Sequence, residues 1–155
     1  MPIDVTAERV IPIPPGRVAA YAMDWRHDAA WTQGIREAAL TREADTGGFG
    51  VGAEVTRTAY FLGKRIDYVL RYVLRVIAHE PPELLDMASV AGPMPMHVTY
   101  TFAPHPGGTL ARIRIRIRVR GEAGGFYRLA APAMARKVRS SLVQDLRDLE
   151  RRLLG

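Results

Sequence analysis

The chain contains no cysteine, which excludes disulfide bonds, a thiolate nucleophile and any zinc site built on cysteine. It also lacks an apolar run of about 18 residues, the length that a membrane-spanning helix needs, so no membrane span is predicted. The stretch from Met1 to Val5 has neither a basic segment nor an apolar core, so we predict no signal peptide. We therefore expect a cytoplasmic protein.

Histidine and serine are scarce. The histidines are His27, His79, His97 and His105. They lie far apart and form no His-x-His or His-Glu-x-x-His pair, so neither a metal nor a cofactor is predicted. None of the three serines stands in a Gly-x-Ser-x-Gly motif. The glycines of residues 47–52 precede a predicted strand rather than a helix, which favours a turn over a phosphate-binding loop.

Lysine is almost absent, so nearly all the positive charge is arginine, apart from Lys64 and Lys137. Residues 108–155 carry 12 Lys/Arg against 4 Asp/Glu, whereas residues 1–107 carry 10 against 12. An arginine-rich segment can mark a nucleic-acid, membrane or acidic partner. Solvated basic faces are more common, so we do not expect nucleic acid, and peripheral contact with a membrane stays open. The sequence does not indicate an oligomeric state.

The overall composition is that of an ordinary globular protein, with 48% hydrophobic and 25% charged residues in a chain of 155. That length is enough to bury a core without disulfides. No internal repeat, low-complexity tract or linker interrupts the chain. We predict one domain over residues 1–155.

The longest helical signal lies between Gly124 and Gly155. From Pro132 onward, apolar residues recur at three- and four-residue steps, as on one face of a helix. These residues are Ala135, Val138, Leu142, Leu146, Leu149 and Leu153. Proline suits the first turn of a helix, so we predict that the helix begins at Pro132 and that residues 125–131 form a bent lead-in. About 22 residues at ~1.5 Å each make a rod of about 33 Å, which needs a broad apolar surface to cover.

The chain before this helix is typical of strands with two short helices. A first strand is predicted over residues 3–13, followed by short helices over residues 17–22 and 27–32. Further strands are predicted over residues 35–42, 53–62, 65–78, 84–90, 96–103 and 111–120. Gly63 and Lys64 predict a tight hairpin between two of them.

The last strand has the clearest pattern. Ala111, Ile113, Ile115, Ile117 and Val119 alternate without a break with Arg112, Arg114, Arg116, Arg118 and Arg120. A shift of one residue would bury all five arginines, so the register is strongly determined. Residues 65–78 show a similar alternation, with one buried and one solvated face.

These elements predict an α+β fold. About seven antiparallel strands, each with one apolar face, must be covered, and only the C-terminal helix is long enough to do so. The two short helices can close only one side. We therefore expect a hydrophobic cavity between a curved sheet and the long helix.

Several short motifs point to a family. They are Gly52-Ala53-Glu54, the Pro-Pro-Glu-Leu-Leu run of residues 81–85, the Gly-Gly-Thr of residues 107–109, Asp24-Trp25 followed by Trp31, and the terminal helix with its proline. Together they resemble the polyketide cyclase/dehydrase branch of the START-related (SRPBCC) superfamily, from Val5 to Leu154. The resemblance implies a helix-grip fold with a deep hydrophobic pocket, which members use as lipid carriers, quinone or sterol binders, and aromatase/cyclases.

The resemblance leaves three functions open, because a fold does not select among them. We favour binding of a small hydrophobic ligand, lipidic, polyketide or aromatic, in the cavity of a carrier or binding protein. The first alternative is a polyketide cyclase/dehydratase of the aromatase type, with Tyr68, Tyr72 or Tyr100 as catalytic candidates. The second is an adaptor that binds an anionic partner through the strand face from Arg112 to Arg120.

The candidate ligand-binding residues lie on the predicted inward side of the strands, on the apolar side of the helix, or near the mouth of the implied pocket. They are Trp31, Arg57, Phe61, Tyr68, Tyr72, Met96, Val98, Tyr100, Phe102, Ile113, Ile115, Met134 and Val138. For the aromatic candidates the alternative is simple core packing, because Tyr and Trp pack well in sheets.

Two polar candidates depend on strand parity. If Arg57 shares the inward face with Val55, it needs an anionic partner, from a ligand carboxylate or from the wall. The opposite register places Arg57 at the surface, and the alternation does not decide between them. His97 has the parity of Thr99, which predicts that it points outward.

Overall fold

The computed structural model describes residues 3–32, 34–62, 67–92, 95–118 and 124–155, with the side chains of all of these except 60–62, 67–70 and 124–131. The elements are β1 (Ile3–Ile11), α1 (Pro15–Ala22), the 3-10 helix η1 (Trp25–His27), α2 (Asp28–Trp31), β2 (Ile35–Arg42), β3 (Glu54–Leu62), β4 (Asp67–Glu80), β5 (Leu84–Ala91), β6 (Met96–His105), β7 (Gly108–Ile117) and α3 (Gly124–Leu154). The predicted order of strands and helices is confirmed.

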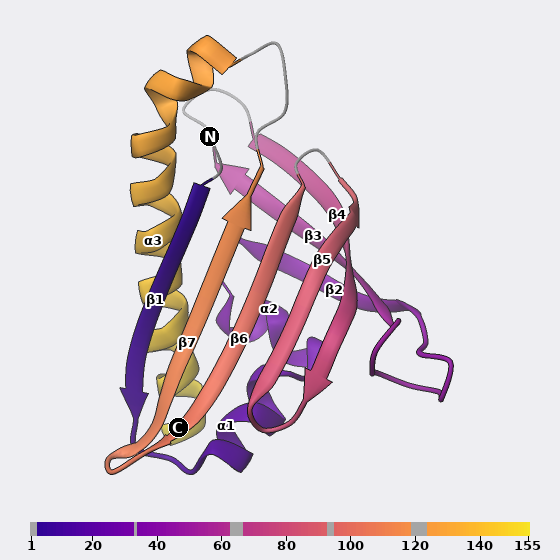
Figure 1. Cartoon of the computed structure of the whole chain (residues 1–155), viewed down its shortest axis with the longest axis vertical. Coiled ribbons are helices and arrows are strands. Elements are labelled where there is room, and N and C mark those ends of the chain that lie inside the picture. The colour runs from indigo at the N-terminus through magenta and orange to yellow at the C-terminus, as the bar shows by residue number, and fades with distance from the viewer. Residues whose placement is uncertain (1–2, 33, 63–66, 93–94, 119–123) are drawn as a thin grey trace.

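The seven strands form one curved antiparallel sheet in the order β1-β7-β6-β5-β4-β3-β2 (Figure 1). Strands β2 to β7 each pair with their neighbours in sequence, and β1 joins the sheet against β7, with Ile3 opposite Ile117. The long helix α3 runs beside β1 (Figure 1). In this view α2 lies behind β5 and β6, and α1 lies near the lower end of β6. This arrangement is the predicted helix-grip fold.

The face of the sheet that packs against α2 and α3, here the inner face, carries the core. Val98, Tyr100 and Phe102 of β6 are buried on it, beside Ile113 of β7. On β7 the arginines Arg112 and Arg114 are exposed on the opposite, outer face. The predicted register of this strand is therefore confirmed up to Ile117. Val119 and Arg120, and the hairpin predicted at Gly63 and Lys64, lie outside the described residues.

The prediction that the long helix begins at Pro132 is wrong. α3 is one helix from Gly124 to Leu154, and Pro132 lies inside it. Proline removes one backbone hydrogen bond and crowds the preceding turn, which bends a helix without necessarily ending it. Figure 1 shows the first turns of α3 leaning away from the axis of the rest.

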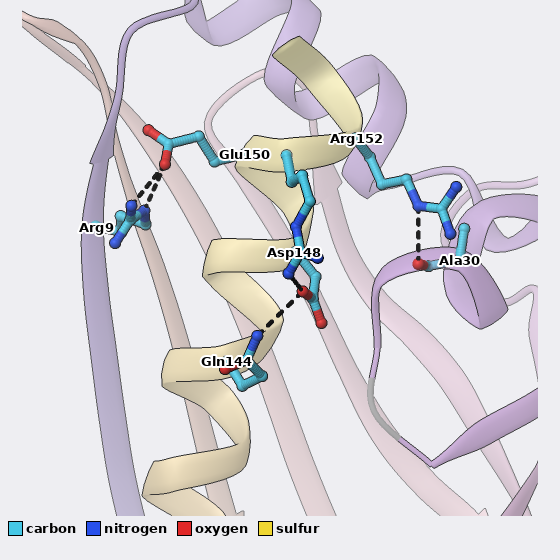
Figure 2. Close-up of polar contacts among 7 residues, drawn as sticks. Arg9, Ala30, Gln144, Asp148, Glu150 and Arg152 are labelled. Carbon is cyan, nitrogen blue, oxygen red and sulfur yellow. Dashed lines mark hydrogen bonds and ion pairs between the residues drawn. The ribbon is translucent and has the colours of Figure 1, made fainter. Parts of the chain in front are cut away.

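The second half of α3 is fixed to the body of the protein. Leu142, Leu146 and Leu149 are buried in the core. Arg9 of β1 donates from Nε and Nη2 to Glu150 Oε2, at 3.0 and 2.6 Å. Arg152 Nε donates to the carbonyl oxygen of Ala30 at 3.3 Å (Figure 2). These contacts set the direction of α3 along β1.

One glycine is required where β7 begins beside the end of β1. Gly108 has a φ of +128°, and a Cβ atom there would lie 2.3 Å from the carbonyl oxygen of Ile11. Only a residue without a side chain allows the two backbones to approach so closely. In the part of the chain that the structure describes, no helix is long and apolar enough to cross a membrane.

Candidate functional site

A buried ion pair joins the sheet to α2. Arg57 lies on the inner face of β3 between Val55 and Ala59, and is only 4% exposed. Its Nε donates to Asp28 Oδ2 at 2.9 Å, and Asp28 is itself 2% exposed. The structure therefore settles the parity that the sequence left open. A carboxylate of the wall is the anionic partner of Arg57.

Two aromatic residues complete this group. Arg57 Nη2 donates to the Tyr100 hydroxyl at 3.2 Å. The Trp31 ring packs against the Tyr100 ring, with ring centroids 5.7 Å apart and planes tilted by 57°. We refer to Asp28, Trp31, Arg57 and Tyr100 as the Arg57 cluster. It brings together α2, β3 and β6, which are far apart in the sequence.

Burial and charge change the protonation of the Arg57 cluster in opposite ways. Burial raises the pKa of Asp28, while the Arg57 guanidinium opposes that rise. Burial alone would lower the pKa of Arg57, but the charge of Asp28 and the contact with Tyr100 raise it well above its ordinary value. Burial raises the pKa of Tyr100 to about 12. Tyr100 therefore keeps its proton at neutral pH and can donate a hydrogen bond, but it cannot serve as a base there.

Two hydrogen-bond donors in or next to the Arg57 cluster have no acceptor among the described residues: one belongs to Trp31 and the other to Thr32, the residue that follows it. These groups, the Trp31 indole nitrogen and the Thr32 hydroxyl, are buried. The Tyr100 oxygen accepts a bond from Arg57, and its O–H is a further donor of the cluster. An unpaired buried donor costs free energy, so the Trp31 and Thr32 groups would gain from an acceptor atom placed beside them.

Beside the cluster, several inner-face residues are only partly buried. They are Tyr72, Met96, Ile115, Met134 and Val138, here the inner apolar patch. Tyr72 lies opposite Arg57 in the β3–β4 register. Met96 begins β6, and Met134 and Val138 belong to the first half of α3. Ile115 lies on β7 two residues before the end of that strand, so the patch includes residues of β4, β6, β7 and α3.

The structure separates the predicted site residues into three groups. Trp31, Arg57 and Tyr100 meet in the Arg57 cluster, and Tyr72, Met96, Ile115, Met134 and Val138 form the inner apolar patch. The fully buried core members are Val98, Phe102 and Ile113. The side chains of Phe61 and Tyr68 lie outside the described residues. Contact of any of these residues with a ligand stays a prediction.

Sequence reasoning missed two buried carboxylates, Asp28 and Asp145. Asp145 lies close enough to Tyr100 for its charge to contribute to the raised pKa of that residue. A signal for it was present, because residue 145 falls on the apolar side of the helix between Leu142 and Leu149. Asp28 precedes Trp31 by three residues and so shares a helix face with it, but in so short a helix this signal is weak.

On the outer face three arginines of β7 are paired. Arg112 Nη2 lies 2.9 Å from Glu8 Oε1, and Arg114 Nη2 lies 2.6 Å from Asp4 Oδ2, both across the β1–β7 pair. Arg116 Nη2 lies 2.8 Å from His97 Nδ1, and the other ring nitrogen of His97 contacts Asp86. His97 points outward, and this pairing reduces the charge that the face can offer. An anionic partner at this face stays a prediction.

A surface cavity of about 630 Å³ lies away from the cluster, between α1, η1 and the turn between β4 and β5. Trp25, Phe49 and His79 line it, with the Phe49 and His79 rings 5.1 Å apart. Partial burial lowers the pKa of His79. None of the predicted ligand-binding residues is among its lining residues.

Comparisons with known proteins point to one family. Residues 2–154 match the family model described as "Polyketide cyclase / dehydrase and lipid transport". No curated protein matches the sequence significantly.

Solved structures share the fold. A protein from Thermus thermophilus is 21% identical, with a TM-score of 0.77 over 97% of each chain. The Zhui aromatase/cyclase from a Streptomyces species is 14% identical, with a TM-score of 0.74 over 99% of this chain and 94% of that chain. A START superfamily protein from Mycobacterium smegmatis is 13% identical, with a TM-score of 0.74 over 98% of this chain and 96% of that chain. At these identities the likeness shows the fold alone.

Proposed function

The chain belongs to the polyketide cyclase/dehydrase and lipid transport family, and we propose that it binds a small hydrophobic molecule that carries an acceptor oxygen. The apolar body of the ligand would lie on the inner apolar patch, between the sheet and the first half of α3. Its oxygen would accept hydrogen bonds from the Arg57 cluster. The observation that carries this proposal is the buried indole N–H of Trp31, which has no partner among the described residues and belongs to a ring packed against Tyr100.

The energetic cost of the cluster supports a functional role. A buried ion pair gains little over well-packed apolar residues, because two charges lose their hydration. The pair is accompanied by an indole and a hydroxyl that lack partners among the described residues, which adds to the cost. Apolar side chains at these positions would hold the same elements together. A ligand oxygen that accepts hydrogen bonds from these donors would offset the cost of burying polar groups in the cluster.

The donor set defines the class of ligand. The Trp31 indole can only donate, and the Tyr100 hydroxyl has a proton to donate as well. A ketone, ester, quinone or carboxyl oxygen fits such a site, whereas a ligand with only N–H groups does not. The Arg57 charge is balanced by Asp28, so the site does not require an anion. Burial of the apolar part would supply most of the affinity, at about 25 cal/mol per Å².

A second candidate function is cyclase or dehydratase chemistry on a polyketide. Tyr100 favours it, because its raised pKa of about 12 keeps the phenol protonated. The Tyr100 hydroxyl could then donate to a ketone oxygen while an enolate forms there. The buried carboxylate of Asp145 is a candidate for a base, since its charge acts on Tyr100, whereas the carboxylate of Asp28 is already paired with Arg57. The Zhui aromatase/cyclase supplies the fold for comparison, and the chemistry here rests on this chain's own residues.

The test uses two ligands of nearly equal size, 2-acetylnaphthalene and 2-ethylnaphthalene, of which only the first has an acceptor oxygen. We expect the acetyl compound to bind about tenfold more tightly, because one hydrogen bond to a buried donor is worth about 1–2 kcal/mol. Trp31→Phe keeps an aromatic ring but removes the N–H. It should weaken binding of the acetyl compound only. Native mass spectrometry of the purified protein would identify any natural ligand.

Equal affinity for the two naphthalenes would overturn the role of the donors. No binding of either, together with an empty protein in the mass spectrum, would contradict ligand binding altogether. Phe102→Leu, a change within the core beside Tyr100, serves as the control, because it should affect both compounds alike. Turnover of a poly-β-keto thioester that is lost in Tyr100→Phe with binding retained would favour the enzyme.

A further inference from the structure

The outward side of α3 is strongly basic. Arg136, Lys137, Arg139 and Arg147 are exposed there, together with Val143, which is 37% exposed. We refer to these five residues as the outer helix face. Arg136, Lys137 and Arg147 lie on the side of the helix turned away from the buried Leu142, Leu146 and Leu149. Arg139 and Val143 lie at the edge of the buried side and are exposed.

These four cations lie together on one helix, whereas Arg17, Arg71 and Arg118, which are also exposed and have no side-chain partner in the described part of the chain, lie on or beside separate elements. Among the residues that the structure describes, none of the four has a carboxylate or a hydrogen-bond acceptor as partner. By contrast, Arg112 and Arg114 are paired with acids of β1, and Arg151 with Asp148 of α3 itself. Unpaired cations at successive turns of one helix create a local positive field that attracts an anionic surface.

The outer helix face also contains a depression of about 440 Å³. Its lining residues are Arg136, Arg139, Ser140, Val143, Gln144 and Arg147. No carboxylate is among them. Gln144 donates its amide hydrogen to Asp148 Oδ1 at 3.1 Å (Figure 2). Arg151 also pairs with Asp148, so this carboxylate is already occupied. Three guanidinium groups and a hydroxyl around one depression are suited to a phosphate group.

We propose that the outer helix face docks the protein on an anionic phospholipid bilayer, with a lipid phosphate in the depression. This proposal rests on the proposed function, because a carrier of an apolar ligand must meet the membrane that supplies or receives it. Arg136, Lys137 and Arg139 lie on the same half of α3 as Met134 and Val138 of the inner apolar patch. Docking through this half would bring the partly exposed end of the ligand site close to the lipid.

A bilayer fits the surface better than nucleic acid does. Val143 lies between the cations, and Pro132 and Ala133 are exposed one turn before Arg136. Apolar residues among cations gain favourable burial on contact with lipid. Contact with the phosphates of a nucleic acid would not bury these residues in an apolar environment. No described aromatic side chain stands on this face to stack on a base. A nucleic-acid partner is therefore an outcome of the test rather than the expectation.

The test is flotation of the full chain with two kinds of vesicle, phosphatidylcholine alone and phosphatidylcholine with about one-third phosphatidylglycerol. We expect binding only to the second kind, decreasing as salt is raised. Each Lys or Arg near an anionic surface contributes roughly fivefold to partitioning. Arg136→Gln with Arg139→Gln should therefore reduce binding by about 25-fold.

The matched control is Arg17→Gln with Arg71→Gln, which removes the same charge from α1 and from the outer face of β4. It should retain most of the binding. An equal loss in both double variants would show that net charge alone acts, and equal binding to the two kinds of vesicle would exclude an electrostatic contact. Either result overturns the proposal, as does tighter binding of a nucleic-acid duplex that displaces the vesicles.

Binding of 2-acetylnaphthalene, measured in solution without vesicles, separates this proposal from the proposed function. Arg136 and Arg139 lie outside the ligand site, so their double variant should bind that compound as the unmodified protein does. Retained naphthalene binding without any vesicle binding would contradict the docking alone. Vesicle binding without naphthalene binding would contradict the ligand site alone.

Discussion

The inner and outer faces of the sheet use the same residue, arginine, in two opposite ways. On the inner face Arg57 is buried, donates a hydrogen bond to the carboxylate of Asp28 in α2, and donates another to the hydroxyl of Tyr100. On the outer face Arg114 leaves 45% of its side chain exposed and pairs with Asp4, which is equally accessible. Water screens the second pair and cannot reach the first.

The difference shows which arginines carry information about function. A surface pair contributes little and can be exchanged or lost without consequence for the fold. A buried pair constrains the elements around it, because neither partner can be removed alone. Charge in the sequence is therefore a poor guide to function until burial is known.

The largest expected effect is that of Arg57→Met. This substitution leaves Asp28 buried without a partner, so we expect a loss of about 3–5 kcal/mol of unfolding free energy. Urea unfolding would measure it. Arg114→Met on the outer face should change stability far less. Asp28→Leu combined with Arg57→Met should recover most of the loss, and a double variant as unstable as the single one would contradict the unpaired-charge explanation.

An intermediate effect is expected at alkaline pH. The pKa of Tyr100 is raised to about 12 in the folded protein, above its ordinary value of 10.0. The stabilisation by the protonated phenol is complete below pH 10.0 and is lost as the pH rises toward about 12, because the folded state then holds a proton that the unfolded state releases. The loss amounts to about 2–3 kcal/mol.

Thermal unfolding across this pH range should show the alkaline loss, and Tyr100→Phe should reduce it. Tyr72→Phe, a change at the partly exposed inner tyrosine, is the matched control and should leave it in place. An identical alkaline profile in Tyr100→Phe would show that Tyr100 is not the group responsible.

The smallest effect is expected from Arg114→Gln. The hydrogen bond from Arg114 holds the pKa of Asp4 below its ordinary value of 3.8, so this pair stabilises the fold above that pH and the contribution disappears as the pH falls through the lowered pKa. Because the pair is exposed, we expect only a slight decrease in melting temperature at neutral pH. The difference should vanish in strong acid and shrink in high salt. A difference that persists in both would show that Arg114 acts through packing rather than charge.

Most of the fold could be predicted from local patterns. Alternation in β7 and the apolar side of α3 each determine which side chains face the core, because one wrong register would bury several charges. The start of α3 could not be predicted, since Pro132 is compatible both with a first turn and with a bend inside a longer helix. Packing and the neighbouring turns decide between them.

The Arg57 cluster could not be predicted from the sequence. The alternation around Arg57 allowed either face, and Asp28 stood in a short helix with no pattern of its own. Trp31 and Tyr100 were candidates, but nothing in the sequence showed that they meet.

By itself, the amino-acid sequence of this protein determined the order of the strands, which face of β7 is buried, and the presence of the helix that covers the sheet. Hydrophobic periodicity is a pattern among residues that are only a few positions apart, so it can be recognised in the sequence alone. The tertiary structure alone decided that Arg57 turns inward, because its partner Asp28 comes from an element 29 residues away. A buried charge is stable only where the fold places an opposite charge next to it, and that placement depends on the path of the whole chain.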